Sequence, residues 1–169
     1  MRLALFQPDM PQNTGTMLRL GACVNVEVDI IEPCGFVFSE HALRRYGMDY
    51  LELVKYRRHN SWEDFLEFAK SHPDEYGRIV LLTTKSQVPY TEFEFKPNDV
   101  LLLGRESAGV PETVHKKVDA RLVIPMTEVA RSINVAVSAT MVLGEALRQT
   151  NLFPIKNNFC QNQKNTGFK

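Results

Sequence analysis

The sequence predicts an α/β domain in which a parallel β-sheet is flanked by helices. Short apolar runs, rich in Leu and β-branched residues, recur along the chain, and helical patterns lie between most of them. Such runs are typical of buried parallel strands, and their alternation with helices is typical of a layered α/β fold. We expect strands at residues 3–6, 26–31, 51–56, 79–82, 100–103 and 122–124.

The helices are predicted from capping residues and from apolar residues at helical spacing. Asn13 or Thr14 can cap the first helix, and Ser61, followed by acidic residues, caps the third. Pro73 ends that third helix. We expect helices at residues 14–25, 39–46, 61–72 and 132–149.

The last predicted helix, which begins at Ser132, is apolar on nearly all sides. A helix of this kind is buried on all sides. It is therefore either a central core helix or a helix that packs against a partner subunit, with Ala139 and Val142 in the interface. Both alternatives fit the pattern.

Length and composition limit the class of protein. A chain of 169 residues favours one domain, and 44% hydrophobic with 24% charged residues excludes a disordered or fibrous protein. We assign residues 1–153 to this domain and residues 154–169 to a polar, Asn-rich tail. Twenty basic residues balance twenty acidic ones, which excludes the strongly basic composition of a free-standing nucleic-acid-binding domain.

Cysteine, histidine and hydropathy patterns bear on location and on metal sites. Three Cys residues cannot all pair within one chain and form no C-x-x-C motif, which favours a reducing compartment. No apolar run is long enough to span a membrane, and the first is too short for a signal peptide, so we expect a cytoplasmic protein. The four His residues have no ligand spacing, and we expect no metal.

Three loops combine Gly, Pro and polar residues directly after predicted strands, at residues 7–19, 104–111 and 124–138. Ligands of open α/β sheets bind beyond the carboxyl ends of the strands, so these loops are the candidate site. In the first loop, the simpler alternative to a functional role is that Asn13 caps a helix and that Arg19 is a surface charge.

The second and third loops each contain a feature that points to a ligand. Gly104 and Gly109 have the spacing of a phosphate-binding loop, but Val110 and Pro111 replace the Lys and Ser/Thr that would hold phosphate and magnesium. A tight turn and a close approach of the backbone to another ligand both remain open. In the third loop, Asn134 is a poor helix former in an apolar segment and needs a polar partner.

Together these loops closely resemble the three motifs of the SPOUT-superfamily RNA 2′-O-methyltransferases. The first matches N-T-G-x-x-x-R at residues 13–19, the second G-x-E-x-x-G-[VL]-P at residues 104–111, and the third I-P-M…S-[LMI]-N-[VL]-[AS] at residues 124–136. The resemblance covers residues 2–150 and is greatest to the minimal subgroup that modifies the tRNA wobble nucleotide, nucleotide 34. Ile133, where Leu or Met is usual, and the Asn-rich tail depart from the pattern.

The resemblance implies a fold and a reaction that periodicity does not. The C-terminal part of such a chain passes through a loop and forms a trefoil knot, one of the rare exceptions to the rule against threading. S-adenosylmethionine binds in the knot, and its methyl group goes to the ribose 2′-hydroxyl of cytidine or uridine 34. The implied cofactor-binding residues are Leu82, Thr83, Gly104, Glu106, Gly109, Ile124, Met126, Ser132 and Asn134.

The resemblance also implies the roles of individual residues and partners. Gly104 leaves room for the bent cofactor, and Arg19 serves the chemical step as proton acceptor, phosphate clamp or oxyanion donor. Asn13, Glu106 and Asn134 orient Arg19 and the substrate. The expected partners are the tRNA anticodon stem-loop and a second copy of the chain, with Arg44, Arg45, residues 55–59, Arg105 and Arg131 as candidate phosphate contacts.

Two other functions fit the same sequence. One is a knotted RNA-binding or assembly protein without catalysis, and the other is a base methyltransferase of the same superfamily. The tRNA isoacceptors, the choice between cytidine and uridine, and the role of the tail are not predicted.

Overall fold

The structure is a computed structural model that describes residues 1–39 and 54–154. Its strands are β1 (Arg2–Phe6), β2 (Glu27–Ile31), β3 (Tyr56–His59), β4 (Ile79–Leu82), β5 (Val100–Leu103) and β6 (Ala120–Leu122). Its helices are α1 (Pro11–Val24), α3 (Trp62–Ser71), the 3-10 turn η2 (Tyr90–Glu92), α4 (Glu112–His115) and α5 (Val135–Thr150).

The six strands form one parallel sheet in the order β3-β2-β1-β5-β4-β6. The predicted parallel sheet flanked by helices is confirmed. Along the chain, β2 and β3 are added on one side of β1, and β5 later pairs with the other side of β1. The carboxyl ends of β1 and β5 therefore flank the point where the strand order reverses, which is where open α/β sheets bind ligands.

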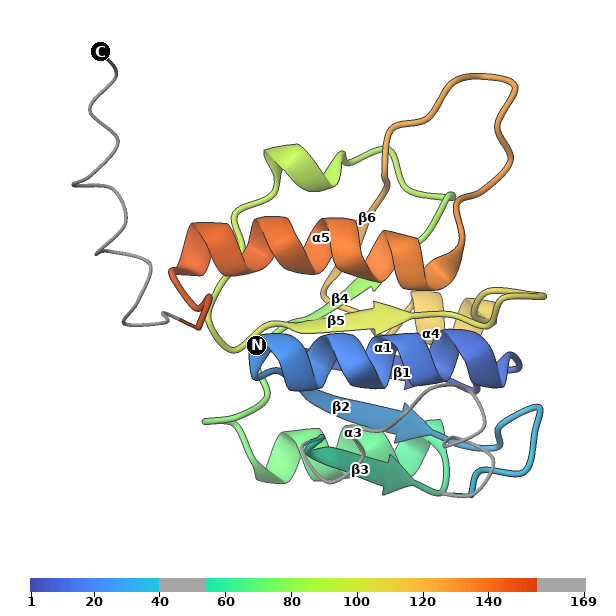
Figure 1. Ribbon diagram of the computed structural model, residues 1–169, viewed down its shortest axis with the longest axis vertical. Helices are drawn as coiled ribbons and strands as arrows, with labels where there is room; N and C mark the ends of the chain where they lie inside the picture. Colours follow the sequence, from blue (N-terminus) through green and yellow to red (C-terminus); the bar gives the residue numbers. More distant parts are fainter. Residues whose placement is uncertain (40–53, 155–169) are drawn as a thin grey trace, which may run out of the picture.

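Helices cover both faces of the sheet. Helices α1 and α5 lie side by side on one face, and α3 lies behind the other (Figure 1). Because neighbouring strand residues point to opposite faces, Leu3 and Leu5 pack in the core cluster with α1 and α5, whereas Ala4 and Phe6 pack in the cluster with α3. Nearly every side chain of β1 and β5 is consequently buried.

Four of the predicted strands agree closely with the structure, and two do not. The strands at residues 79–82 and 100–103 are confirmed as β4 and β5, and β1 and β2 differ from prediction by one residue. The strand predicted at residues 51–56 is wrong where it can be tested, because β3 begins at Tyr56 and residues 51–53 lie outside the described part. β3 is an edge strand with basic residues, so it has no continuous apolar run. β6 ends at Leu122, two residues before the predicted end.

The first and third helices test the capping predictions. The prediction that Asn13 or Thr14 caps the first helix is wrong, because α1 begins at Pro11 and both side chains are buried in its first turn. Pro11 suits this position because its missing N–H is not needed there. The Ser61 cap is confirmed: its side chain accepts from the backbone N–H of Asp64. The helix predicted at residues 39–46 lies almost entirely outside the described residues.

The prediction that Ser132 caps the last helix is also wrong. Asn134 is the N-cap of α5, and its side chain accepts from the backbone N–H groups of Ala136 and Val137. Within the protomer, Ala139 and Val142 are fully buried, so they belong to the core and not to a subunit interface. No helix in the described part of the chain is long and apolar enough to cross a membrane.

Candidate active site

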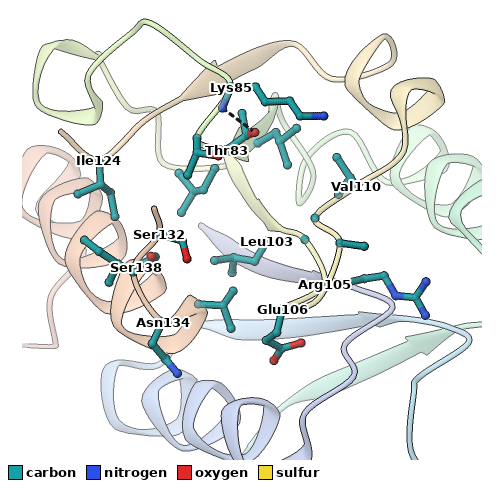
Figure 2. A pocket seen from close by; sticks show the side chains of 18 of the residues that line it. Thr83, Lys85, Leu103, Arg105, Glu106, Val110, Ile124, Ser132, Asn134 and Ser138 are labelled. Carbon is teal, nitrogen blue, oxygen red and sulfur yellow. Dashed lines mark hydrogen bonds between the residues drawn. The ribbon is translucent and has the colours of Figure 1, made fainter. Parts of the chain in front are cut away.

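A cavity of about 400 Å³ lies at the carboxyl ends of β4, β5 and β6, beside the N-terminus of α5. Figure 2 shows Ile124, Ser132 and Ser138 on one side of this cavity and Arg105 and Val110 on the opposite side. The loops after three neighbouring parallel strands converge here because their carboxyl ends share one edge of the sheet. The cavity has the size typical of small-molecule sites, ~300–1,000 Å³.

The loop after β5 closes on itself at the cavity. The backbone of Arg105 donates to Gly109 over 3.0 Å, and that of Gly109 donates back to Arg105 over 2.9 Å. Gly109 has a φ of 66°, a left-handed conformation that favours glycine. These contacts fix a five-residue loop, residues 105–109, against the end of β5.

Gly104 has a role within the protein itself. A Cβ at Gly104 would lie 2.7 Å from the carbonyl carbon of Gly109, so it would meet the protein's own backbone. Gly104 is therefore required for the loop to close. Gly104 also lines the cavity, and its expected role in leaving room for the cofactor stays a prediction.

A chain of side-chain hydrogen bonds lies at the base of the cavity. Asn134 donates from Nδ2 to Oδ1 of Asn13 over 3.0 Å, and Asn13 donates from Nδ2 to Oε1 of Glu106 over 3.0 Å. Asn13 thus supplies the polar partner that Asn134, at an apolar helix start, requires. The chain joins α5, α1 and the loop after β5, so three segments far apart in sequence are held in one arrangement.

Glu106 also contacts the loop after β1. Its Oε2 accepts from the backbone N–H of Asp9 over 3.1 Å, and the hydroxyl of Ser107, the next residue, donates to the Asp9 carboxyl group, so the two carboxyl groups are neighbours. Burial and the Asp9 carboxyl group raise the pKa of Glu106, whereas the hydrogen bond from Glu106 and a hydrogen bond from Ser107 lower the pKa of Asp9.

The structure brings almost all of the expected site residues together. Every residue expected at the cofactor lines the cavity, as does Asn13. Arg19 does not line it and is exposed on α1. Their roles remain predictions. His115, a buried side chain on α4, also lines the cavity, and the sequence did not identify it as a site residue. Ser138, at the end of the predicted third loop and one turn beyond Asn134, lines the cavity as well.

Several basic residues expected to contact phosphates have other partners. Arg58 donates to Glu32 over 2.6 Å, Arg57 stacks over Phe68, and His59 is buried. β3, which carries all three, is the edge strand at the opposite side of the sheet from β4 and β6. His59 is therefore too buried to contact a phosphate, whereas phosphate contacts of Arg57 and Arg58 stay a prediction. Arg105 lines the cavity, Arg131 is exposed, and Arg44 and Arg45 lie outside the described residues.

The fold and the three loops are those of one protein family. Residues 1–144 match the model of the SpoU rRNA methylase family, and the chain belongs to this family. It is 59% identical over 147 residues to a tRNA (cytidine(34)-2′-O)-methyltransferase of Beijerinckia indica, covering 87% of this chain and 90% of the relative. The resemblance inferred from the three loop motifs is thus confirmed at the level of the family.

Solved structures agree with this assignment. One, described as giving structural insights into the 2-OH methylation of C/U34 on tRNA, is 36% identical, has a TM-score of 0.80, and matches 88% of this chain and 94% of its own. An AdoMet-bound rRNA methyltransferase of Sinorhizobium meliloti is 26% identical, has a TM-score of 0.76, and matches 87% of this chain and 55% of its own. Within the described residues, no group of three or more His, Cys, Asp or Glu side chains could hold a metal ion.

Proposed function

We propose that this protein transfers a methyl group from S-adenosylmethionine to the ribose 2′-hydroxyl of nucleotide 34, a cytidine or uridine, in tRNA. The observation that carries the proposal is the cavity at the ends of β4, β5 and β6, which the three loop motifs line together. The tRNA (cytidine(34)-2′-O)-methyltransferase relative, at 59% identity, supports the substrate. An enzyme that acts on tRNA works where tRNA is found, so the proposal places the protein in the cytoplasm.

The residues around the cavity fit the cofactor. Leu82, Leu103, Ile124 and Val135 offer an apolar surface for a purine ring, and Ser132 and Asn134 supply polar groups for a ribose or an amino acid moiety. When bound, S-adenosylmethionine supplies a methyl group on a positively charged sulfur. Met126, Gly104 and Gly109 complete the walls.

The protein's own contribution is mainly to align the reactants. Transfer of a methyl group is an in-line displacement, so fixing the hydroxyl oxygen and the methyl carbon in position supplies much of the rate. The chain Asn134–Asn13–Glu106 holds the two helix starts and the glycine loop at the cavity. Arg19 lies outside the cavity lining, on the same helix as Asn13, and serves as a phosphate clamp or oxyanion donor for the incoming nucleotide. An arginine is protonated at ordinary pH, which disfavours the role of free base.

We also propose that the protein is a homodimer. On α5, Val137 is 49% exposed and Met141 is 39% exposed, although the rest of the apolar residues on this helix are largely buried. Exposed apolar side chains next to one another on a helix are typical of an interface. A second copy would also add basic surface for the tRNA anticodon stem-loop, which a chain with balanced charges otherwise lacks.

The proposal also includes the trefoil knot. Val123, just after β6, pairs with Val88 and Pro89 in the segment that follows β4. Farther along, Gln149 of α5 donates to the carbonyl of Phe93 and accepts from the N–H of Phe95. The C-terminal part of the chain thus contacts the loop between β4 and β5 just after β6 and again in the last turn of α5, as a chain threaded through that loop would.

Methyl transfer in solution tests the function. The protein is incubated with radiolabelled S-adenosylmethionine and unmodified tRNA, and calorimetry measures cofactor binding separately. We expect micromolar or tighter cofactor binding and label in tRNA. Cofactor binding without transfer to any tRNA would favour an RNA-binding protein without catalysis, and label in a nucleobase would favour a base methyltransferase.

A further inference from the structure

The hydrogen-bond chain at the cavity has a fixed direction. Oδ1 of Asn134 accepts from two backbone N–H groups of α5, so its Nδ2 must be the donor toward Asn13. Oδ1 of Asn13 then accepts, and its Nδ2 must donate to Glu106. Glu106 is consequently required as the final acceptor. A carboxylate accepts more strongly than a carboxylic acid does, so the charge of Glu106 governs the strength of the whole chain.

Asp9 contacts Glu106 at this final position. Its backbone N–H donates to Oε2 of Glu106, and its Oδ2 accepts from the hydroxyl of Ser107. Its other oxygen, Oδ1, is buried and has no hydrogen-bond donor within the described part of the chain. Two carboxyl groups in such proximity form a hydrogen bond only when one of them holds a proton.

The position of Asp9 is itself fixed. The backbone N–H of Gly35 donates to the carbonyl of Pro8 over 2.9 Å. A Cβ at Gly35 would lie 2.6 Å from Cβ of Asp9, so the loop after β2 packs closely against this side chain. Other charged or titratable groups on the elements around the pair are Arg19 on α1, Arg105 on the same loop as Glu106, Glu32 and Cys34 after β2, Lys85 after β4, and Glu128 and Arg131 before α5.

From this geometry we infer that Asp9 is a positioning residue of the methyl-transfer site, which holds Glu106 in place and makes the rate depend on a proton that the two carboxyl groups share. The inference rests on the proposed function. When the pair takes up the proton, the carboxyl groups of Glu106 and Asp9 form a hydrogen bond with each other. Glu106 then accepts less strongly from Asn13. The alignment of Asn13 and Asn134 then weakens, and the rate falls toward acid pH.

Substitutions of Asp9 separate positioning from mere packing. In Asp9→Asn, the amide oxygen can still accept from Ser107 while the amide N–H donates permanently to Glu106, so no shared proton is needed. We expect a plateau rate within about threefold of wild type, with the acid fall in rate moved to lower pH by roughly half a unit or more. Asp9→Ala loses both contacts, and its plateau rate should fall about 10- to 100-fold.

Single-turnover rates at saturating tRNA and cofactor, from pH 5 to pH 9, measure these effects. Asp74→Asn, an exposed carboxylate beyond α3, is the matched control and should leave the profile unchanged. If the rate of Asp9→Asn falls toward acid at the same pH as the rate of wild type, the inference is overturned, whatever the plateau rate of the variant.

A second measurement does not depend on activity. The carboxyl carbon of Glu106, assigned with Glu106→Gln, is titrated by NMR in wild type and in Asp9→Asn. We expect Glu106 to take up its proton at lower pH in the variant, and equal titration curves would contradict a shared proton. Absence of methyl transfer by the wild type, in contrast, would contradict the proposed function.

Discussion

Asn134 donates a 3.0 Å hydrogen bond to Asn13, which lies 121 residues earlier in the chain. Each of the two amides has a second partner: Asn134 caps α5, and Asn13 donates to Glu106. One pair of side chains therefore connects the starts of two helices to the glycine loop after β5. An asparagine that is unfavourable inside a helix is favourable here because it is the cap.

Two substitutions of Asn134 separate its two roles. Asn134→Ala removes the cap and should lower the free energy of unfolding by about 1 kcal/mol. Asn134→Asp keeps an oxygen that can cap α5 but loses the donor to Asn13, so its stability should stay within about 0.5 kcal/mol of wild type while its rate falls roughly 10- to 100-fold. Urea unfolding and single-turnover rates check both. A wild-type rate for Asn134→Asp would show that the contact with Asn13 has no part in the reaction.

Gly104→Ala tests the closure of the glycine loop. The added Cβ would lie 2.7 Å from the backbone of Gly109, so the loop must open. We expect a loss of about 1–3 kcal/mol in stability, as for overpacking in a core, together with weaker cofactor binding. Urea unfolding and calorimetry measure the two. A stable Gly104→Ala protein that binds the cofactor poorly would instead support a direct clash with the ligand.

Prediction from sequence succeeded where a pattern is local. β4 and β5 are continuous apolar runs because both of their faces are buried, and their bounds were predicted to the residue. β3 was misplaced because it is an edge strand. Such a strand is only partly buried, so its sequence, Tyr-Arg-Arg-His, has no continuous apolar run. The family resemblance identified the cavity residues, because each motif follows a strand and parallel strands bring their ends together.

The contacts between the loops could not be predicted. Nothing in the local pattern shows that Asn134 would meet Asn13, because that pairing depends on how α5 packs beside α1. The close approach of Gly104 to Gly109 was not predicted for a similar reason, because it depends on how the loop closes on itself. The role of Asp9 could not be predicted because its neighbour Glu106 is distant in sequence.

Stability should depend on pH through Asp29 of β2. Burial alone would raise the pKa of Asp29, but hydrogen bonds from His59 and Arg2 outweigh it and hold the pKa below its usual value. A lowered folded-state pKa stabilises the protein above the unfolded pKa of about 3.9, and this contribution is lost as the pH falls through the folded value.

Asp29→Asn removes the buried carboxylate of Arg2 but leaves the ion pair of Arg2 with Glu27, so at pH 7 it should cost somewhat less than the ~3–5 kcal/mol of a fully unpaired buried charge. Urea unfolding of both proteins between pH 7 and pH 2.5 should show this difference narrowing below about pH 4. A difference that stays constant over the whole range would mean that the charge of Asp29 does not stabilise the fold.

Substitutions on α5 test the homodimer. Val137→Glu or Met141→Glu places a charge on an exposed position, so it should give a folded monomer. Ala139→Glu should unfold the protomer, because Ala139 is fully buried and an unpaired charge there costs several kcal/mol. Lys70→Glu, on the exposed side of α3, is the control and should remain dimeric. Light scattering at micromolar concentration decides, and a monomeric wild type would contradict the interface.

Arg19→Lys tests the role of the exposed arginine on α1. Lysine keeps the charge but loses the planar fork that can hold two oxygens. If Arg19 aligns the nucleotide or stabilises the oxyanion, single-turnover rates at saturating tRNA should fall by roughly two to four orders of magnitude with normal cofactor binding. A loss that appears only in tRNA affinity and recovers at low salt would make Arg19 a simple phosphate contact.

Methylation of tRNA with a single change at nucleotide 34 tests the proposed reaction. Matched tRNAs carrying a ribose or a 2′-deoxyribose at this nucleotide are incubated with the protein and S-adenosylmethionine, and the products are mapped by nuclease digestion and mass spectrometry. We expect one methyl group on the ribose of nucleotide 34, and none in the 2′-deoxy tRNA. A methyl group on a base, at another nucleotide, or in the 2′-deoxy tRNA would contradict it.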